Sequence, residues 1–290
     1  MFDVFLCYIY NYKELKETTM SITLEHKQAL VAGNGLLPVV FAQNAKANGF
    51  EVIAISLSSD NRNELKKYCS KVYDCAPGEL IKINEIFAKE GIKQLTFIGK
   101  VSKSIVIKRP KFDSMALELL KNTKKLNDDA VMLTLVNELE KAGITVLDQT
   151  IFIKNLMAPK GVLGSIQPTQ KDLNDVNYGF EIAKEMGKLD IGQSVVIKDC
   201  MIMAIEAIEG TDKCIKRGAK LAKKDAVIVK VAKPQQDKRF DIPAFGLKTL
   251  KTMHKYRAKL IAVEAGETIL VDQQKTIDYA NKHNIIVMAV

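Results

Sequence analysis

Histidine is scarce in this chain, and its scarcity argues against one kind of metal centre. The 290 residues contain three histidines, His26, His254 and His283, and none belongs to an H-x-x-x-H or D-x-H pattern. The dinuclear sites of many phosphoesterases take several of their ligands from histidine. We therefore do not expect a histidine-rich metal centre.

Cysteine pairs, long apolar runs and targeting signals are also lacking. The five cysteines are odd in number and form no C-x-x-C, which favours free thiols in a reducing compartment over a disulfide framework. No apolar run approaches the roughly 20 residues of a membrane-spanning helix. The apolar start carries Asp3 and no basic segment, so it is a poor signal peptide. We expect a cytoplasmic protein and treat residues 1–26 as an N-terminal extension, with Met20 as an alternative start.

The composition is that of an ordinary globular protein, with 47% hydrophobic and 27% charged residues and a formal net charge of +9. The charge favours anionic partners such as nucleotides, phosphates, nucleic acid or an anionic membrane surface, but it does not choose among them. A solvated lysine-rich surface is an equally good explanation. Basic and aromatic residues do not interleave as they do in proteins that bind single strands, so we expect no nucleic acid partner.

The first half of the chain alternates strands and helices. This alternation predicts a Rossmann-like domain over residues 27–155, with a parallel sheet covered by helices. Strands are predicted at Gln28–Ala32, Glu51–Leu57, Lys71–Tyr73, Gln94–Ile98 and Thr145–Leu147, and helices at Pro38–Asn48, Asn61–Cys69, Glu79–Glu90, Ser114–Lys124 and Asp128–Ala142.

The second half predicts a smaller mixed α/β domain over residues 172–290. Residues 156–171 break the pattern with two prolines and two glycines, and we interpret them as a linker. Thr211 or Asp212 is expected to cap a helix that runs to Lys223. The other predicted helices are Leu173–Met186, Pro243–Lys255 and Thr276–Lys282, and the strands are Ser194–Ile197, Met201–Ala207, Ala226–Val231, Leu260–Val263, Thr268–Val271 and Ile285–Ala289.

A glycine-containing turn follows the first predicted strand. Gly33-Asn34-Gly35 precedes a helix, and a helix N-terminus offers unpaired N–H groups to an anion. A dinucleotide fingerprint needs a third glycine where Pro38 stands, and no clear ribose-binding acid ends the second strand. Anion binding and a tight structural turn both stay open. Lys100 follows another strand and is either a phosphate ligand or a solvated side chain.

The richest polar segment runs from Lys233 to Gly246. Lys233, Lys238 and Arg239 carry positive charges that can neutralise a diphosphate. The arginine can in addition bind two oxygens at once. Asp241 would be ionised at neutral pH, since a free aspartate has a pKa of about 3.9, and it suits Mg²⁺ ligation or the orientation of a water. The alternative is that Asp241 caps the helix predicted near Pro243.

An acidic cluster lies between residues 206 and 212. Glu206 and Asp212 are candidate Mg²⁺ ligands, because hard cations take oxygen ligands. The alternative is that these acidic residues are only stabilised by the dipole of the helix that follows them. No G-x-x-x-x-G-K-[ST] occurs, so a P-loop is not indicated.

Several segments, in this order, resemble the UDP-2,3-diacylglucosamine diphosphatases of the LpxI type. The resemblance runs from about residue 27 to the end, and its specific parts are Leu189–Gln193, Glu206–Asp212 and Asp241–Pro243. The other segments that carry it are Ala32–Pro38, Phe97–Ser102, Asp128–Ala130, Lys233–Gln236 and Val263–Gly266.

The resemblance implies two domains with a ligand cleft between them. It also implies Mg²⁺-dependent hydrolysis of UDP-2,3-diacylglucosamine to UMP and 2,3-diacylglucosamine 1-phosphate (lipid X), a step of lipid A biosynthesis. Asp241 would be the catalytic residue, and water would attack the phosphorus on the sugar side. Substrate contacts are expected at Gly33, Gly35, Leu36, Ile98, Gly99, Lys100, Val146, Ser165, Ile166, Gln167, Thr169, Gln193, Val195, Thr211, Asp212, Lys233 and Arg239.

Two other functions and two partners remain to be weighed. A nicotinamide-dependent oxidoreductase and a non-catalytic nucleotide-binding protein are the alternative functions. The charge of +9 fits transient peripheral contact with the anionic inner face of the inner membrane. A homodimer is left open.

Overall fold

The computed structural model describes residues 23–101, 112–123 and 128–290 of the chain. The chain divides after Ile153 into two units. Most of the predicted N-terminal extension, residues 1–22, lies outside the described residues. The second unit begins with a short 3₁₀ helix, η1 (Lys154–Leu156), which ends where the predicted linker of residues 156–171 begins.

The first unit contains a five-stranded sheet, β1 (Lys27–Ala32), β2 (Glu51–Ser56), β3 (Lys71–Asp74), β4 (Gln94–Ile98) and β5 (Thr145–Val146). The strand order is β3-β2-β1-β4-β5, and all neighbours pair in parallel. The chain order reverses between β1 and β4, which is the switch point of a doubly wound sheet. The predicted Rossmann-like parallel sheet is confirmed.

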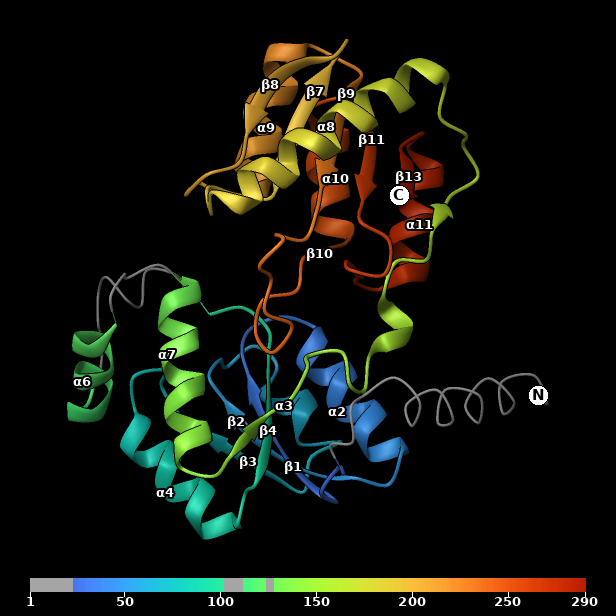
Figure 1. The fold of residues 1–290 in the computed structure, drawn as a ribbon. Coiled ribbons are helices and arrows are strands. Elements are labelled where there is room, and N and C mark those ends of the chain that lie inside the picture. Colours follow the sequence, from blue (N-terminus) through green and yellow to red (C-terminus); the bar gives the residue numbers. More distant parts are fainter. Residues whose placement is uncertain (1–22, 102–111, 124–127) are drawn as a thin grey trace, which may run out of the picture. The chain divides into compact units, whose positions relative to one another are not determined.

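The helices of the first unit are α2 (Leu37–Ala47), α3 (Arg62–Leu65), α4 (Leu80–Glu90), α6 (Ser114–Asn122) and α7 (Asp128–Lys141). In Figure 1, α2 lies on one side of this sheet and α4 and α7 on the other. Gly49 follows α2 with φ +82°, as its predicted role as a left-handed cap requires. The helix predicted over Asn61–Cys69 is shorter, because after Leu65 the chain continues as turns that bond back to Glu64 and Leu65.

The second unit contains a six-stranded mixed sheet of order β6-β13-β11-β9-β7-β8. Its strands are β6 (Gly161–Val162), β7 (Ser194–Lys198), β8 (Met201–Ile205), β9 (Ala226–Lys230), β11 (Ala258–Val263) and β13 (Ile286–Ala289). The three central strands β9, β11 and β13 are parallel, and β6, β7 and β8 are antiparallel to their neighbours. The predicted mixed α/β domain is confirmed.

Alternation along these strands separates two hydrophobic cores. Val195, Ile197 and Val229 pack under α8 (Gln170–Lys188). Val196 and Ile228, which alternate with them, face the opposite side. That side is covered by α9 (Thr211–Ala222), α10 (Leu247–Lys255) and α11 (Gln273–Lys282).

Two predicted helix caps are wrong. Ala244–Phe245 forms β10, which pairs with β12 (Ile269–Leu270), so α10 begins only after Gly246. Asp241 therefore does not cap a helix near Pro243. The N-cap of α9 is Gly210 and has no side-chain cap, so Thr211 and Asp212 lie inside the helix. Among the described residues, no helix is long and apolar enough to cross a membrane.

Candidate functional site

Two glycine turns meet at the switch point of the first sheet. Gly33 follows β1 and Gly99 follows β4, and their neighbours Asn34 and Lys100 form an isolated antiparallel bridge. The N–H of Asn34 donates to the Lys100 carbonyl at 2.8 Å, and the N–H of Lys100 donates back at 2.9 Å. The structure thus brings together Gly33, Ile98, Gly99 and Lys100 at the edge where open α/β sheets bind ligands.

The contact between the two turns explains why glycine stands at Gly33 and Gly99. A Cβ on Gly33 would lie 2.7 Å from the carbonyl carbon of Gly99, and a Cβ on Gly99 would lie 2.8 Å from that of Gly33. For these two residues the structure supports the tight-turn interpretation. Gly35 differs, since it has φ +109° and open space where a Cβ would point.

Two side chains from the loop that follows β2 also reach the glycine turn. The Asn61 amide donates to the carbonyl oxygens of Gly33 and Gly35 at 2.7 and 3.2 Å. Asp60 accepts a 2.7 Å hydrogen bond from the side chain of Asn34. An acid therefore does lie beside the turn, although the sequence pattern did not single it out. Leu36 is exposed next to it.

Val146 and Ile98 occupy a different environment from the exposed turn. Both are predicted substrate contacts, and both side chains are buried within strands of the first sheet.

In the second unit, most of the predicted site residues gather at one edge of the sheet. The parallel strands β9 and β11 end there, and the antiparallel register places the end of β8 and the start of β7 beside them. We call this the carboxyl edge. It is formed by residues 189–193, 206–212, 230–241 and 264–266.

Lys233 is the centre of a charged group at the carboxyl edge. Its Nζ lies 2.7 Å from Asp190 Oδ1 and 3.7 Å from Asp241 Oδ2. The Lys233 side chain is only 12% exposed, whereas those of Asp190 and Asp241 are 34% and 32% exposed. The two carboxylates are thus reachable from solvent while the ammonium is largely shielded.

Gln236 connects the same group to the backbone. Its Oε1 accepts a 2.7 Å bond from the Lys233 N–H, and its Nε2 donates to Asp241 Oδ2. The neighbouring cations have separate partners. Arg239 pairs with Asp237 at 2.7 Å and Lys238 with Glu267 at 2.8 Å.

The Asp237 carboxyl shows the effect of its pairing. Burial raises its pKa, but the hydrogen bonds from Arg239 outweigh burial and hold the pKa below its usual range. Arg239 therefore lies in the same loop as Asp241 but is engaged with Asp237.

A second polar group lies deeper at the carboxyl edge. Glu206 Oε1 accepts from the Thr211 hydroxyl at 2.9 Å, and Lys230 Nζ donates to the same hydroxyl at 3.0 Å. Ser194 pairs directly with Lys230 across the sheet. Three oxygen atoms have no hydrogen-bond partner among the residues that the structure describes: Glu206 Oε2, Ser194 Oγ and Gln193 Oε1. Val195, the remaining predicted contact of β7, is fully buried.

The three candidate metal ligands do not form a cage by themselves. Asp212 is paired with Lys248 at 3.1 Å, Glu206 is bonded to Thr211, and Asp241 lies beside Lys233. Within residues 23–101, 112–123 and 128–290 no group of three His, Cys, Asp or Glu side chains could hold a metal ion. Mg²⁺, however, usually needs only one or two carboxylates together with substrate phosphates. The partly exposed Asp241 fits that mode.

Ser165 and Thr169 lie at the opposite end of α8. Thr169 is the N-cap of α8 and forms a capping box with Asp172. The 19 residues of α8 span about 28 Å, so Thr169 is far from Asp190, which follows the other end. Ser165 is bonded to Asn281 through its N–H and its hydroxyl, and Ile166 packs against the core while Gln167 is exposed.

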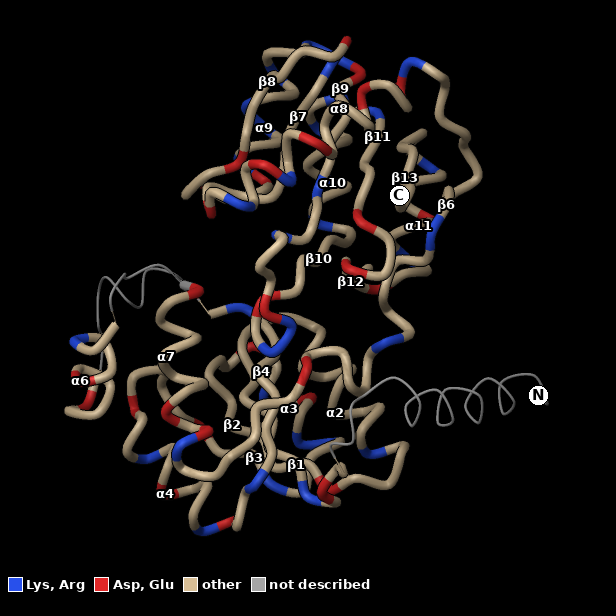
Figure 2. Tube along the Cα trace, viewed as in Figure 1, with Lys and Arg blue, Asp and Glu red and all other residues tan. Residues whose placement is uncertain are grey.

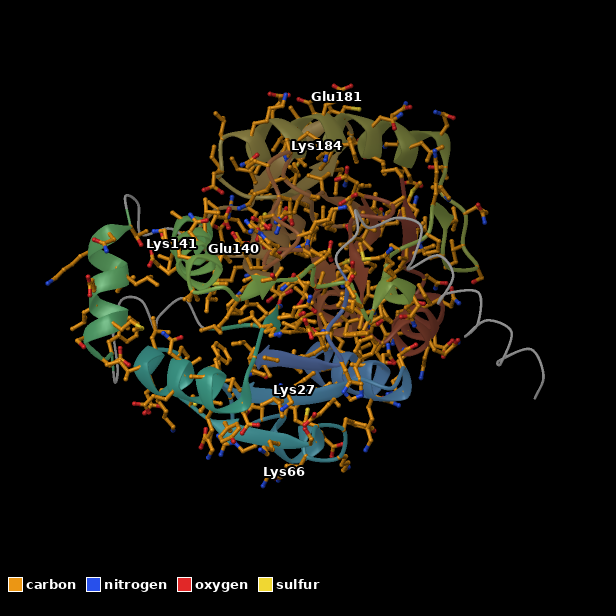
Figure 3. The ribbon with its side chains drawn as sticks, turned by 60° about the horizontal axis from the view of Figure 1, so that its bottom comes forward. Lys27, Lys66, Glu140, Lys141, Glu181 and Lys184 are labelled. Atoms are coloured by element: carbon orange, nitrogen blue, oxygen red, sulfur yellow. The ribbon has the colours of Figure 1, made fainter. Side chains whose placement is uncertain are left out.

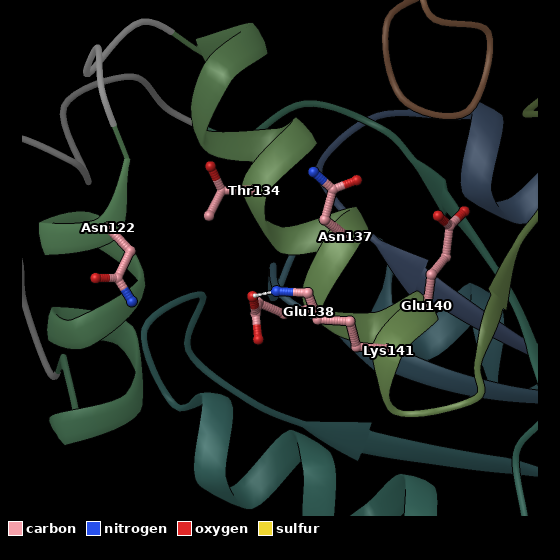
Figure 4. Close-up of a pocket in the computed structure, with 6 residues that line it drawn as sticks. All are labelled: Asn122, Thr134, Asn137, Glu138, Glu140 and Lys141. Carbon is pink, nitrogen blue, oxygen red and sulfur yellow. Dashed lines mark hydrogen bonds and ion pairs between the residues drawn. The ribbon is translucent and has the colours of Figure 1, made fainter.

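A pocket of about 770 Å³ in the first unit carries none of the predicted site residues. Figure 4 shows it between α6 and α7, with Asn122 on one side and Thr134, Asn137, Glu138, Glu140 and Lys141 on the other. We assign it no role.

Two residues of the charged group were absent from the predicted site. Asp190 and Gln236 both contact the Lys233–Asp241 group. Each stands inside a segment that carries the family resemblance, Leu189–Gln193 and Lys233–Gln236. The motifs were therefore the available signal, but spacing along the chain did not indicate which residue meets Lys233.

Comparison with other proteins gives partial likenesses outside the family. Over 149 residues, 49% of this chain, it is 29% identical to the bifunctional purine biosynthesis protein PurH of Clostridium botulinum, of which the match covers 28%. Among solved structures, the ADP complex of an N5-carboxyaminoimidazole ribonucleotide synthetase is 13% identical, with a TM-score of 0.26, over 70% of this chain and 46% of that one. That similarity is too low to bear on function.

Two family models and one relative match nearly the whole chain. The LpxI N-terminal domain model matches residues 27–156 and the LpxI C-terminal domain model matches residues 159–288. A UDP-2,3-diacylglucosamine pyrophosphatase LpxI from Caulobacter vibrioides is 30% identical over 280 residues, which is 91% of this chain and 97% of that protein. The resemblance inferred from the motifs is confirmed, and the chain belongs to the LpxI family.

Proposed function

We propose that this protein hydrolyses the diphosphate of UDP-2,3-diacylglucosamine and releases UMP and 2,3-diacylglucosamine 1-phosphate, a step of lipid A biosynthesis. The relative from Caulobacter vibrioides is named for this pyrophosphatase activity and aligns with nearly the whole chain. The observation that supports the proposal best is the charged group of Lys233 and Asp241, an ammonium 3.7 Å from a solvent-accessible carboxylate.

The chemistry of the reaction requires these two kinds of group. A diphosphate resists attack because its negative charge repels the nucleophile, so catalysis depends on neutralising that charge and aligning a water. Lys233 supplies positive charge at the carboxyl edge. Asp241 orients the water toward the sugar-side phosphorus. A bond forms between the water oxygen and that phosphorus, the bond to the bridging oxygen breaks, and UMP leaves.

Mg²⁺ is part of the proposal. Asp241 would hold the ion together with oxygens of the diphosphate, and the ion would supply Lewis-acid stabilisation of the developing charge. Glu206 is a less suitable ligand because it is buried, and Asp212 is less suitable because it is paired with Lys248 at 3.1 Å. We expect chelation by EDTA to abolish turnover and added Mg²⁺ to restore it. Full activity in EDTA would contradict this part.

A phosphorus NMR time course with purified protein and UDP-2,3-diacylglucosamine tests the activity directly. We expect UMP and the sugar 1-phosphate to appear together, and labelled oxygen from isotopically labelled water to enter the sugar 1-phosphate. Asp241→Asn should lower kcat on the order of 10²- to 10⁴-fold. Unchanged substrate signals with wild-type protein, or near wild-type turnover by Asp241→Asn, would refute the proposal.

We also propose that the protein contacts an anionic membrane surface transiently. Its net charge is +9, and basic residues are distributed over both units, as Figure 2 shows. In the segments of the carboxyl edge, Leu189 is 72% exposed and Ile208 is 85% exposed. Sedimentation with vesicles containing anionic lipid should weaken as salt rises. Salt-independent sedimentation would contradict the electrostatic account.

A further inference from the structure

Asp190 is held in a backbone conformation that few residues adopt. It follows α8 with φ +55°, in the left-handed region, and its N–H donates to the Gly187 carbonyl at 3.0 Å. Aspartate and asparagine tolerate this region better than most side chains do. The conformation directs the chain back over the end of α8, and Ile191 N–H bonds to the Met186 carbonyl at 3.2 Å.

The end of α8 is also fastened to the Lys233 loop by contacts that involve no charge. A Cβ on Gly187 would lie 3.2 Å from the Cα of Lys233 and 3.2 Å from Pro234 Cδ, so the backbones approach closely. The Gln235 amide donates to the Gly187 carbonyl at 2.7 Å. Asp190 and Lys233 therefore face each other across a fixed junction.

A further anchor at the base of the loop comes from α8 itself. Lys184, which projects from α8 in Figure 3, donates to the Ala232 carbonyl at 2.9 Å and pairs with Glu264 at 2.7 Å. Glu264 accepts in turn from the Ala232 N–H at 2.8 Å. The start of the loop is thus fixed independently of Asp190.

The position of the Lys233 ammonium depends on two carboxylates at unequal distances. Asp190 is in direct contact at 2.7 Å, and Asp241 lies 1 Å farther away at 3.7 Å. A lysine stem has four rotatable bonds, and its compact charge follows the strongest available partner. Without Asp190, the ammonium would pair directly with Asp241 and occupy the carboxylate that has to orient water or bind Mg²⁺.

We infer that Asp190 is a positioning residue that holds the Lys233 ammonium beside Asp241 without letting it close on the carboxylate. The inference rests on the proposed function for its catalytic meaning. Its structural part, that Asp190 holds Lys233, can be tested separately. Two measurements keep these parts distinguishable.

The first measurement is lysine labelling by reductive methylation, read by mass spectrometry on the full chain. Asp190→Gly keeps the left-handed backbone and removes the carboxylate. It is made in an Asp241→Asn background, where residue 241 carries no charge for the ammonium to close on, and there we expect it to accelerate methylation of Lys233 severalfold relative to Asp241→Asn alone. Glu267→Gln is the matched control, because it breaks the Lys238–Glu267 pair of the same loop. It should accelerate methylation of Lys238 and leave Lys233 unchanged. A Lys233 rate that is the same in Asp241→Asn with and without Asp190→Gly would overturn the inference whatever the activity.

The second measurement is steady-state hydrolysis of UDP-2,3-diacylglucosamine. Asp190→Gly should lower kcat on the order of 10²-fold, as expected when a catalytic group is misplaced by about 1 Å, with a smaller change in KM. Asp190→Asn keeps an acceptor oxygen and should recover part of the loss. Glu267→Gln should retain wild-type kcat.

A double variant separates positioning from general damage. If Asp190 acts through Lys233, adding Asp190→Gly to Lys233→Gln should cost less than about twofold further. Independent, multiplying losses would overturn the inference, as would failure of Asp190→Asn to recover any activity. Absence of turnover in the wild type would instead refute the proposed function, and the labelling result would still decide whether Asp190 holds Lys233.

Discussion

The glycine turn of the first unit and the charged loop of the second both follow strands at a sheet edge, yet different forces hold them. Gly33 and Gly99 are fixed by backbone contact and two backbone hydrogen bonds between their neighbours. Lys233 and Asp241 are held by charge and by the side chain of Gln236. The packed backbone atoms at Gly33 and Gly99 have no charged partner that a ligand could replace. The partly exposed charged side chains of the second loop can exchange one partner for a ligand. This difference is why we propose the chemistry for the second loop.

The largest expected effect is on stability and tests whether backbone contact holds the glycine turn of the first unit. Gly33→Ala would put a methyl group 2.7 Å from the Gly99 carbonyl carbon, and backbone cannot give way as a flexible side chain would. We expect a loss of about 3 kcal/mol in the free energy of unfolding. Urea denaturation should show this loss equally at low and high salt, since no charge is involved. A salt-dependent loss, or none, would contradict backbone packing as the cause.

A charge-based prediction for the second unit concerns Asp172, which accepts from Thr169 and from Lys259. Burial raises the pKa of the Asp172 carboxyl, but its hydrogen bonds to Lys259 and Thr169 outweigh burial and hold the pKa below its usual range. With a folded pKa below the unfolded value, the stabilisation is complete above about pH 4 and is lost as pH falls through the folded pKa.

Asp172→Asn should therefore cost about 2 kcal/mol at neutral pH and less in acid. Urea denaturation of the wild type and the variant at about pH 7 and at about pH 3 measures this cost at each pH. Asp225→Asn is the control, because its ion pair with Lys224 is exposed and 3.9 Å long, and it should change stability by less than about 0.5 kcal/mol. A cost for Asp172→Asn that stays constant with pH would exclude the carboxylate as its source.

Apart from the Asp225 control, the smallest expected effect on stability is that of Gly35→Ala, which distinguishes Gly35 from the two packed glycines of the turns. Gly35→Ala meets open space but keeps φ +109°, so only backbone strain of about 1 kcal/mol is expected. If this residue approaches the nucleotide, calorimetry should show UMP binding weakened by about tenfold. Unchanged UMP affinity would mean that the whole turn is structural.

Hydrophobic periodicity and turn residues in the sequence predict most elements of the fold. The strands and helices of the first unit follow from hydrophobic periodicity and from Gly49 and Gly91 at helix ends, where the left-handed conformation is needed. The error at Pro243 arose because a two-residue strand, Ala244–Phe245, pairs with Ile269–Leu270, which are distant in sequence. Such a pairing leaves no local signal. Asp241 and Lys233 could be selected from their residue types, whereas Asp190 could not.

The amino-acid order alone determined the alternation of strands and helices, the family and the presence of a basic–acidic segment near residue 240, because these depend on local periodicity and on motifs within short stretches. The tertiary structure decided which charges meet. Asp190 and Lys233 are separated by 43 positions and come within 2.7 Å only because α8 ends against the loop that follows β9. It also separated Thr169 from that group by the length of α8. Distances between side chains depend on packing among remote segments, which no local pattern records.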